Sequence, residues 1–168
     1  MFRLFLIAML LTPLLACSTD EPGTPSPSSS ATSSDYMVLR STTKFPFNDV
    51  AENIDMAITD LGYKIDNHAY IGRMLERTKE ALGAKNTVYL NAQQFRFCPA
   101  QYSRNMLSAD PHNIAFCPYI INVYNTPDNP KKVYVMFRKP AIVGSEESKK
   151  ALRAVETLLT GIIDEALQ

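Results

Sequence analysis

The sequence lacks most of the short motifs that indicate a particular reaction. It contains no nucleotide-binding Gly-rich loop, no Gly-x-Ser-x-Gly nucleophile elbow and no paired-histidine signature of zinc proteases. Its three cysteines include no Cys-x-x-Cys pair, and only two histidines are available as metal ligands. These absences disfavour the common hydrolases, nucleotide-binding enzymes and zinc enzymes.

The sequence also lacks an excess of charge and an apolar run long enough to span a bilayer. The whole chain has 17 basic and 17 acidic side chains; without residues 1–16, which contain Arg3 and no acid, 16 basic and 17 acidic ones remain. No electrostatic surface for nucleic acid is expected from this balance. The apolar segment at residues 4–15 is shorter than the roughly 20 residues of a spanning helix.

Residues 1–16 instead have the pattern of a secretory signal peptide. A basic residue precedes the apolar segment, and the small Ala16 comes just before Cys17. The segment Leu14-Leu15-Ala16-Cys17 resembles the bacterial lipoprotein signal, in which the cysteine thiol receives a diacylglycerol and becomes the new N-terminus. We therefore expect lipidation of Cys17 and a membrane anchor on the periplasmic face of a bacterial envelope. Ser18 after Cys17 resembles the pattern of lipoproteins released to the outer membrane.

The remaining chain divides into a tether and one folded domain. From Ser18 to Asp35 the sequence is almost entirely Ser, Thr, Pro, Ala and acid, with no large apolar side chain to offset the entropy of ordering. The chain after Tyr36 is long enough for one domain with a core. We predict a signal peptide at 1–16, a lipidated cysteine and disordered tether at 17–35, and a single domain at 36–168.

Hydrophobic spacing predicts strands and helices along residues 36–168. Asp49 and Glu52 have the spacing of a capping box. Gly62 is suited to the left-handed backbone conformation that often ends an α-helix. The predicted strands are 36–39, 63–70, 87–97, 114–124 and 133–137, and the predicted helices are 49–61, 71–82, 99–109 and 145–167. A turn cluster at 125–130 joins the last two strands as an antiparallel hairpin.

The last helix has the clearest pattern. Ser145 is suited to its N-cap, and Glu146 and Glu147 suit the positive end of its dipole. One apolar stripe follows, made of Leu152, Val155, Leu158, Leu159, Ile162, Ile163, Ala166 and Leu167. Because such a stripe needs a sheet to cover it, we predict an α+β two-layer sandwich, with a mainly antiparallel sheet and helices on one face.

This order of elements resembles the domain-of-unknown-function 302 family over residues 44–167. The resemblance rests on Asp66-Asn67-His68 after the first helix, on Cys117-Pro118-Tyr119-Ile120, and on residues 133–138 leading into Lys139-Pro140. It implies a compact two-layer sandwich and no established activity. The two Phe-Cys-Pro segments look like the mark of a subgroup.

Phe97-Cys98-Pro99 and Phe116-Cys117-Pro118 repeat one tripeptide. With Cys17 acylated, Cys98 and Cys117 form an even pair in an oxidising compartment, so we predict a structural disulfide between them. Closing a loop of about 20 residues would stabilise the fold by roughly 3 kcal/mol in the chain-entropy model. A catalytic dithiol is disfavoured, because no Cys-x-x-Cys is present and no neighbouring helix start with a basic residue lowers a thiol pKa.

Four further side chains are weaker candidates for ligand or metal contacts, namely Asp66, His68, Met106 and His112. Such soft or borderline ligands, together with the cysteines, suit copper or haem iron. Each of these residue types is more often a structural residue of a strand, core or turn than a ligand. We therefore expect no metal and no cofactor. Asp66 and His68 would point to the same sheet face if their strand is regular. No catalytic residue is predicted.

The sequence thus predicts a lipid-anchored, periplasm-facing domain that binds a small ligand or another envelope protein and catalyses no reaction. The alternative is an envelope redox or metal-handling protein, for copper or haem, that uses the cysteine pair. A tyrosine-rich set could line a small-molecule cleft, although tyrosines are ordinary residues on sheet surfaces. These are Tyr89, Tyr102, Tyr119, Tyr124 and Tyr134.

Replacing Cys17 by Ser in the full chain should leave an unprocessed precursor without lipid, because acylation requires that thiol. A Cys98→Ser variant keeps Cys17 and should be lipidated like the wild type. Cell fractionation and intact-mass spectrometry measure both. An unlipidated wild-type protein would remove the basis for the envelope location.

Overall fold

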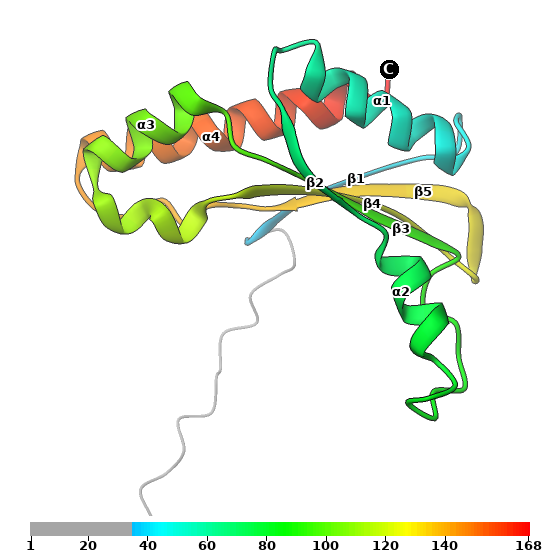
Figure 1. The fold of residues 1–168 in the computed structure, drawn as a ribbon. Helices are drawn as coiled ribbons and strands as arrows, with labels where there is room; N and C mark the ends of the chain where they lie inside the picture. Colours follow the sequence, from blue (N-terminus) through cyan, green and yellow to red (C-terminus); the bar gives the residue numbers. More distant parts are fainter. Residues whose placement is uncertain (1–34) are drawn as a thin grey trace, which may run out of the picture. The chain divides into compact units, whose positions relative to one another are not determined.

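A five-stranded antiparallel sheet organises the chain (Figure 1). The structure is a computed structural model that describes residues 35–168, so the predicted signal peptide and residues 17–34 of the tether lie outside the described residues. The strands are β1 (Met37–Thr42), β2 (Ile65–Ala69), β3 (Asn91–Phe97), β4 (Tyr119–Thr126) and β5 (Asn129–Arg138). Their order in the sheet is β1-β5-β4-β3-β2, and every neighbouring pair is antiparallel.

Four α-helices and one 3-10 helix connect and cover the strands. They are α1 (Phe47–Thr59), α2 (Ile71–Thr78), α3 (Ala100–Ala109), the 3-10 helix η1 (Pro111–Phe116) and α4 (Glu146–Glu165). Figure 1 shows α1, α3 and α4 on one side of the sheet and α2 on the other. Within residues 35–168, no helix is both long and apolar enough to cross a membrane.

The core lies between the sheet and helices α1 and α4. Along β4 and β5, buried residues alternate with more exposed ones, as expected for strands with one covered face. The covered face and the helices contribute the largest fully buried side chains, among them Ile54, Ile58, Phe95, Phe97, Ile121, Phe137, Leu152, Ile162 and Ile163. The predicted α+β two-layer sandwich is confirmed.

The start of α4 follows its local sequence signal, whereas the start of α1 is set by packing in the core. Ser145 caps α4 as predicted, because its Oγ accepts a hydrogen bond from the Ser148 amide at 3.2 Å. The predicted capping box of Asp49 and Glu52 is wrong, since α1 begins at Phe47 after Pro46 and has no side-chain cap. Phe47 is buried in the core, so its packing extends the helix towards the N-terminus.

Helix α2 is an appendage to the sheet and contributes little to the core. Only Gly72 of this helix is buried. A Cβ atom added there would lie 2.8 Å from the backbone nitrogen of Ala92 in β3, so the absence of a side chain permits this close approach. The predicted helix 71–82 ends at Thr78, and Leu82 is 77% exposed.

The predicted strand at 114–124 is divided in the structure. Its first part belongs to η1, and β4 begins only at Tyr119. The Asp110 carboxylate accepts a hydrogen bond from the His112 amide at 2.9 Å, and the Cys117 amide donates to the Ile114 carbonyl at 3.1 Å. These local bonds satisfy the backbone that a strand would have paired with its neighbour.

Truncating Leu152 to Ala should destabilise the protein by about 2–5 kcal/mol, because the side chain is fully buried and its removal leaves a cavity. Thr157→Ala, at an exposed position of the same helix, should change the unfolding free energy by less than about 0.5 kcal/mol. Urea unfolding of both variants measures the difference. Equal effects would show that α4 does not pack on the sheet.

Candidate functional site

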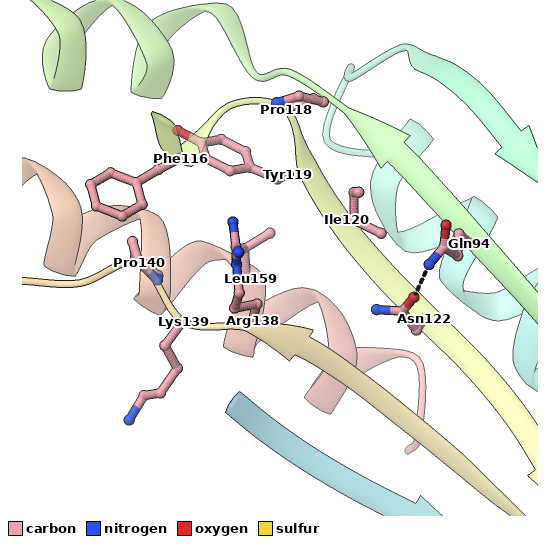
Figure 2. Close-up of a pocket in the computed structure, with 10 residues that line it drawn as sticks. All are labelled: Gln94, Phe116, Pro118, Tyr119, Ile120, Asn122, Arg138, Lys139, Pro140 and Leu159. Carbon is pink, nitrogen blue, oxygen red and sulfur yellow. Dashed lines mark hydrogen bonds between the residues drawn. The ribbon is translucent and has the colours of Figure 1, made fainter. Parts of the chain in front are cut away.

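The candidate site is a hollow at the end of the sheet where β4 and β5 separate. The two strands pair from Ile121 and Phe137 towards their hairpin, and no pairing joins the residues on the other side of that pair. Residues 118–120 and 138–140 form the walls of a hollow of about 310 Å³. Leu159 of α4 also lines it, so the hollow reaches the helix layer between the separated strands (Figure 2).

Arg138 supplies positive charge to this hollow. Because Phe137 before it is buried in the core, strand alternation places Arg138 on the face away from the helices. Figure 2 shows its side chain directed towards the space between Phe116 and Ile120. Among residues 35–168, Arg138 has no ion-pair partner. Lys139 points away from the hollow and pairs with Glu156 at 3.0 Å.

A fixed amide pair forms the polar end of the hollow. The Gln94 side-chain nitrogen donates to the Asn122 side-chain oxygen at 2.7 Å, and the Asn122 nitrogen donates to the Met136 carbonyl at 3.3 Å. Both amides also border a second hollow of about 200 Å³, whose apolar lining includes Ile71 and Tyr89. The amide pair therefore separates two hollows on the same side of the sheet.

We call the side of the sheet away from α1 and α4 the open face. Its residues, assigned from strand register and alternation, are Met37, Leu39, Ser41, Asn67, Ala69, Ala92, Gln94, Arg96, Ile120, Asn122, Tyr124, Tyr134, Met136 and Arg138. None of these residues is acidic, and two are arginines. Arg96 pairs in register with Ile120 and, among residues 35–168, forms no ion pair. The open face is thus cationic on a chain of balanced charge.

The predicted tyrosine set divides between the two sides of the sheet. Tyr124 stacks on Tyr134 with ring centroids 5.1 Å apart, and Tyr89 meets the edge of Tyr124 at 5.3 Å. Tyr89 and Tyr124 also line the second hollow, and Tyr134 lies beside Tyr124 on the open face. Tyr119 is buried on the helix side, where its hydroxyl donates to the Met106 sulfur at 3.6 Å.

The two cysteines lie beside the hollow. Cys98 follows β3 and Cys117 precedes β4, and their Sγ atoms are 3.8 Å apart. The Ser103 hydroxyl of α3 lies 3.1 Å from the Cys98 sulfur and 3.8 Å from the Cys117 sulfur. The sulfur atoms are in contact but not bonded to each other, and the disulfide between them stays a prediction.

Burial changes the pKa values of Cys117 and Tyr119. It raises the pKa of the half-buried Cys117 thiol; the Ser103 hydrogen bond opposes this shift, and the neighbouring Cys98 adds to it. Burial also raises the pKa of the Tyr119 phenol, and the adjacent Cys117 raises it further. Both groups therefore keep their protons at neutral pH.

His68 is held by ring stacking and by two side-chain hydrogen bonds, one of which joins its Nδ1 to the Tyr70 hydroxyl at 3.5 Å. Its Nε2 lies 2.7 Å from the Gln93 side-chain oxygen, and its ring stacks between Tyr70 at 4.6 Å and Phe95 at 4.3 Å. The shared face predicted for Asp66 and His68 required a regular strand, and β2 is not regular. An irregularity between Ile65 and Asn67 shifts the register and breaks the alternation.

The other candidate ligands lie in separate elements. Met106 is fully buried in α3, and His112 is exposed in η1. Within residues 35–168, no three His, Cys, Asp or Glu side chains are grouped to hold a metal ion. Arg138 was not among the predicted site residues, although Tyr134, Met136 and Arg138 alternate with three apolar residues of the same strand.

The family described as "Domain of unknown function DUF302" matches residues 39–166, and the chain belongs to this family. A crystal structure of an uncharacterized conserved DUF302 protein from Bacillus stearothermophilus has a similar fold, with a TM-score of 0.64 and 13% sequence identity. The match covers 77% of this chain and 97% of that one. No curated protein matches the sequence. The predicted family resemblance is confirmed.

Iodoacetamide should alkylate Cys98 of the reduced full-length protein before Cys117. Cys98 is exposed, whereas Cys117 is half-buried and its raised pKa lowers the fraction of reactive thiolate at any given pH. Raising the pH should therefore narrow the difference in rate. Peptide mass spectrometry after timed quenching measures both rates. Equal rates at neutral pH would contradict the burial of Cys117.

Proposed function

We propose that this member of the DUF302 family is a lipid-anchored protein on the periplasmic face of the bacterial envelope, where its folded domain binds a small anionic ligand. The export signal and Cys17 support the anchor, and residues 17–35 have the composition of a tether. The hollow beside Arg138 is the binding site.

The position of Arg138 is the observation that carries the proposal. Its guanidinium borders a concave site, forms no ion pair within residues 35–168 and has planar donors suited to a carboxylate, sulfonate or phosphate. Arg96 lies opposite Ile120 in the sheet, on the same face, and no acidic side chain among residues 35–168 lines the hollow. Charge and shape therefore favour the same class of ligand.

The lining limits the size and character of the ligand. A volume of about 310 Å³ is at the lower end of small-molecule sites, which favours a compact molecule. Phe116, Pro118, Pro140 and Leu159 offer apolar surface, and the amides of Gln94 and Asn122 offer hydrogen bonds. An aromatic or short aliphatic acid combines these features.

The lining also favours binding over catalysis. The described residues around the hollow include no His, Cys, Ser, Asp or Glu that could act as a nucleophile or general base. Tyr119 is the one phenol among them, and burial raises its pKa so that it keeps its proton. Arg138 and the amides can orient a ligand but supply no proton transfer at neutral pH.

Arg138→Gln should weaken binding of 8-anilinonaphthalene-1-sulfonate, an anionic aromatic probe, by roughly ten- to a hundredfold. The variant loses a charge-assisted hydrogen bond worth about 1.5–3 kcal/mol. Arg153→Gln makes the same charge change at an exposed position of α4 and should bind like the wild type. Fluorescence titration of the folded proteins measures all three dissociation constants.

Two outcomes of the titration would contradict the proposed binding site. Unsaturable probe fluorescence in the wild type would show that no defined site exists. Equal weakening in Arg138→Gln and Arg153→Gln would show that the probe responds to net charge alone. Far-UV circular dichroism of each variant checks that the fold is retained.

A further inference from the structure

The cysteine cluster is a second chemical feature, distinct from the hollow. Cys98, Ser103 and Cys117 come from the end of β3, from α3 and from the segment before β4. The chain between the two cysteines forms α3 and η1 and returns beside β3, because β3 and β4 pair up to Phe97 and Tyr119. The antiparallel pairing therefore brings the two thiols together at one end of the sheet.

The sulfur atoms are close enough to bond after a small movement. Their separation of 3.8 Å exceeds a disulfide bond length of about 2.05 Å by less than about 2 Å. The Ser103 hydroxyl is hydrogen-bonded to the Cys98 sulfur at 3.1 Å, and it can donate to a thiolate at that position. The short separation thus leaves only a small movement between the open pair and a bonded one.

The two thiols differ in their access to solvent. Cys98 is exposed, whereas Cys117 is half-buried behind it. An external molecule can thus reach the Cys98 sulfur first. Disulfides with an exposed sulfur are the ones that exchange readily, while shielded ones resist reduction. This asymmetry differs from the purely structural bond predicted from the sequence.

We propose that Cys98 and Cys117 form a reversible thiol–disulfide exchange site for small-molecule disulfides. The Cys98 thiolate attacks one sulfur of a disulfide RSSR, which forms a mixed disulfide on Cys98 and releases RS⁻. Cys117 then gives its proton to water, attacks the Cys98 sulfur and expels the second RS⁻. Two protein thiols are oxidised to one disulfide, and RSSR is reduced to two thiols. Two small thiols reverse the reaction.

Glutathione disulfide serves as the probe, added to the reduced, folded full-length protein. The wild type should close its internal disulfide and retain no glutathione on Cys98 or Cys117. Cys117→Ser should keep one glutathione on Cys98, because no resolving thiol is present. Cys98→Ser should react at least about tenfold more slowly, because only the shielded thiol remains. Intact-mass and peptide mass spectrometry identify each product.

Several results would overturn the exchange site. These are equal rates in the two single variants, a stable glutathione adduct on Cys98 or Cys117 of the wild type, or a closed disulfide that reduced glutathione cannot reopen without denaturant. If a cysteine variant fails to fold, the wild type alone suffices. The fraction of protein with a closed disulfide should rise and fall with the ratio of oxidised to reduced glutathione. A fraction that does not change with this ratio would refute reversibility. Arg153→Gln, at an exposed position of α4, should exchange at the wild-type rate.

Discussion

Burial of one sheet face beneath α1 and α4 is the constraint on which the other features depend. Along β4 and β5, every second side chain is buried in the core, for example Ile121, Val135 and Phe137. The strand period of two then forces the intervening residues to the opposite face. Arg138 and Asn122 are on the open face for that reason, and the chemistry of that face follows from the packing of the other.

The hollow and the cysteine pair lie at the same end of the sheet. There β4 and β5 separate, and the hollow opens between them towards Leu159 of α4. Cys117 lies between Phe116 and Pro118, which both line this hollow. The proposed anion site and the thiol pair therefore adjoin through one segment of chain, yet they use different side chains.

The sequence predicted the elements whose signals are local. The apolar stripe and Ser145 cap of α4, the helix after Pro99 and the β4–β5 hairpin are all confirmed. It failed where tertiary contacts prevail, since packing of Phe47 moved the start of α1 and the irregularity in β2 altered the facing of its residues. The separation of two strands leaves no periodic trace in a sequence, so the hollow and the place of Arg138 in it were visible only in the structure.

According to the proposed function, the hollow beside Arg138 receives a small anion with an apolar body. Backbone amide shifts measured by nuclear magnetic resonance during a titration with 8-anilinonaphthalene-1-sulfonate would locate the bound anion. The largest shifts should lie at residues 116, 117, 119–122, 138 and 139 and at Gln94, around the walls of the hollow. Shifts confined to the outer surfaces of α1 and α4, or spread evenly over the domain, would contradict it.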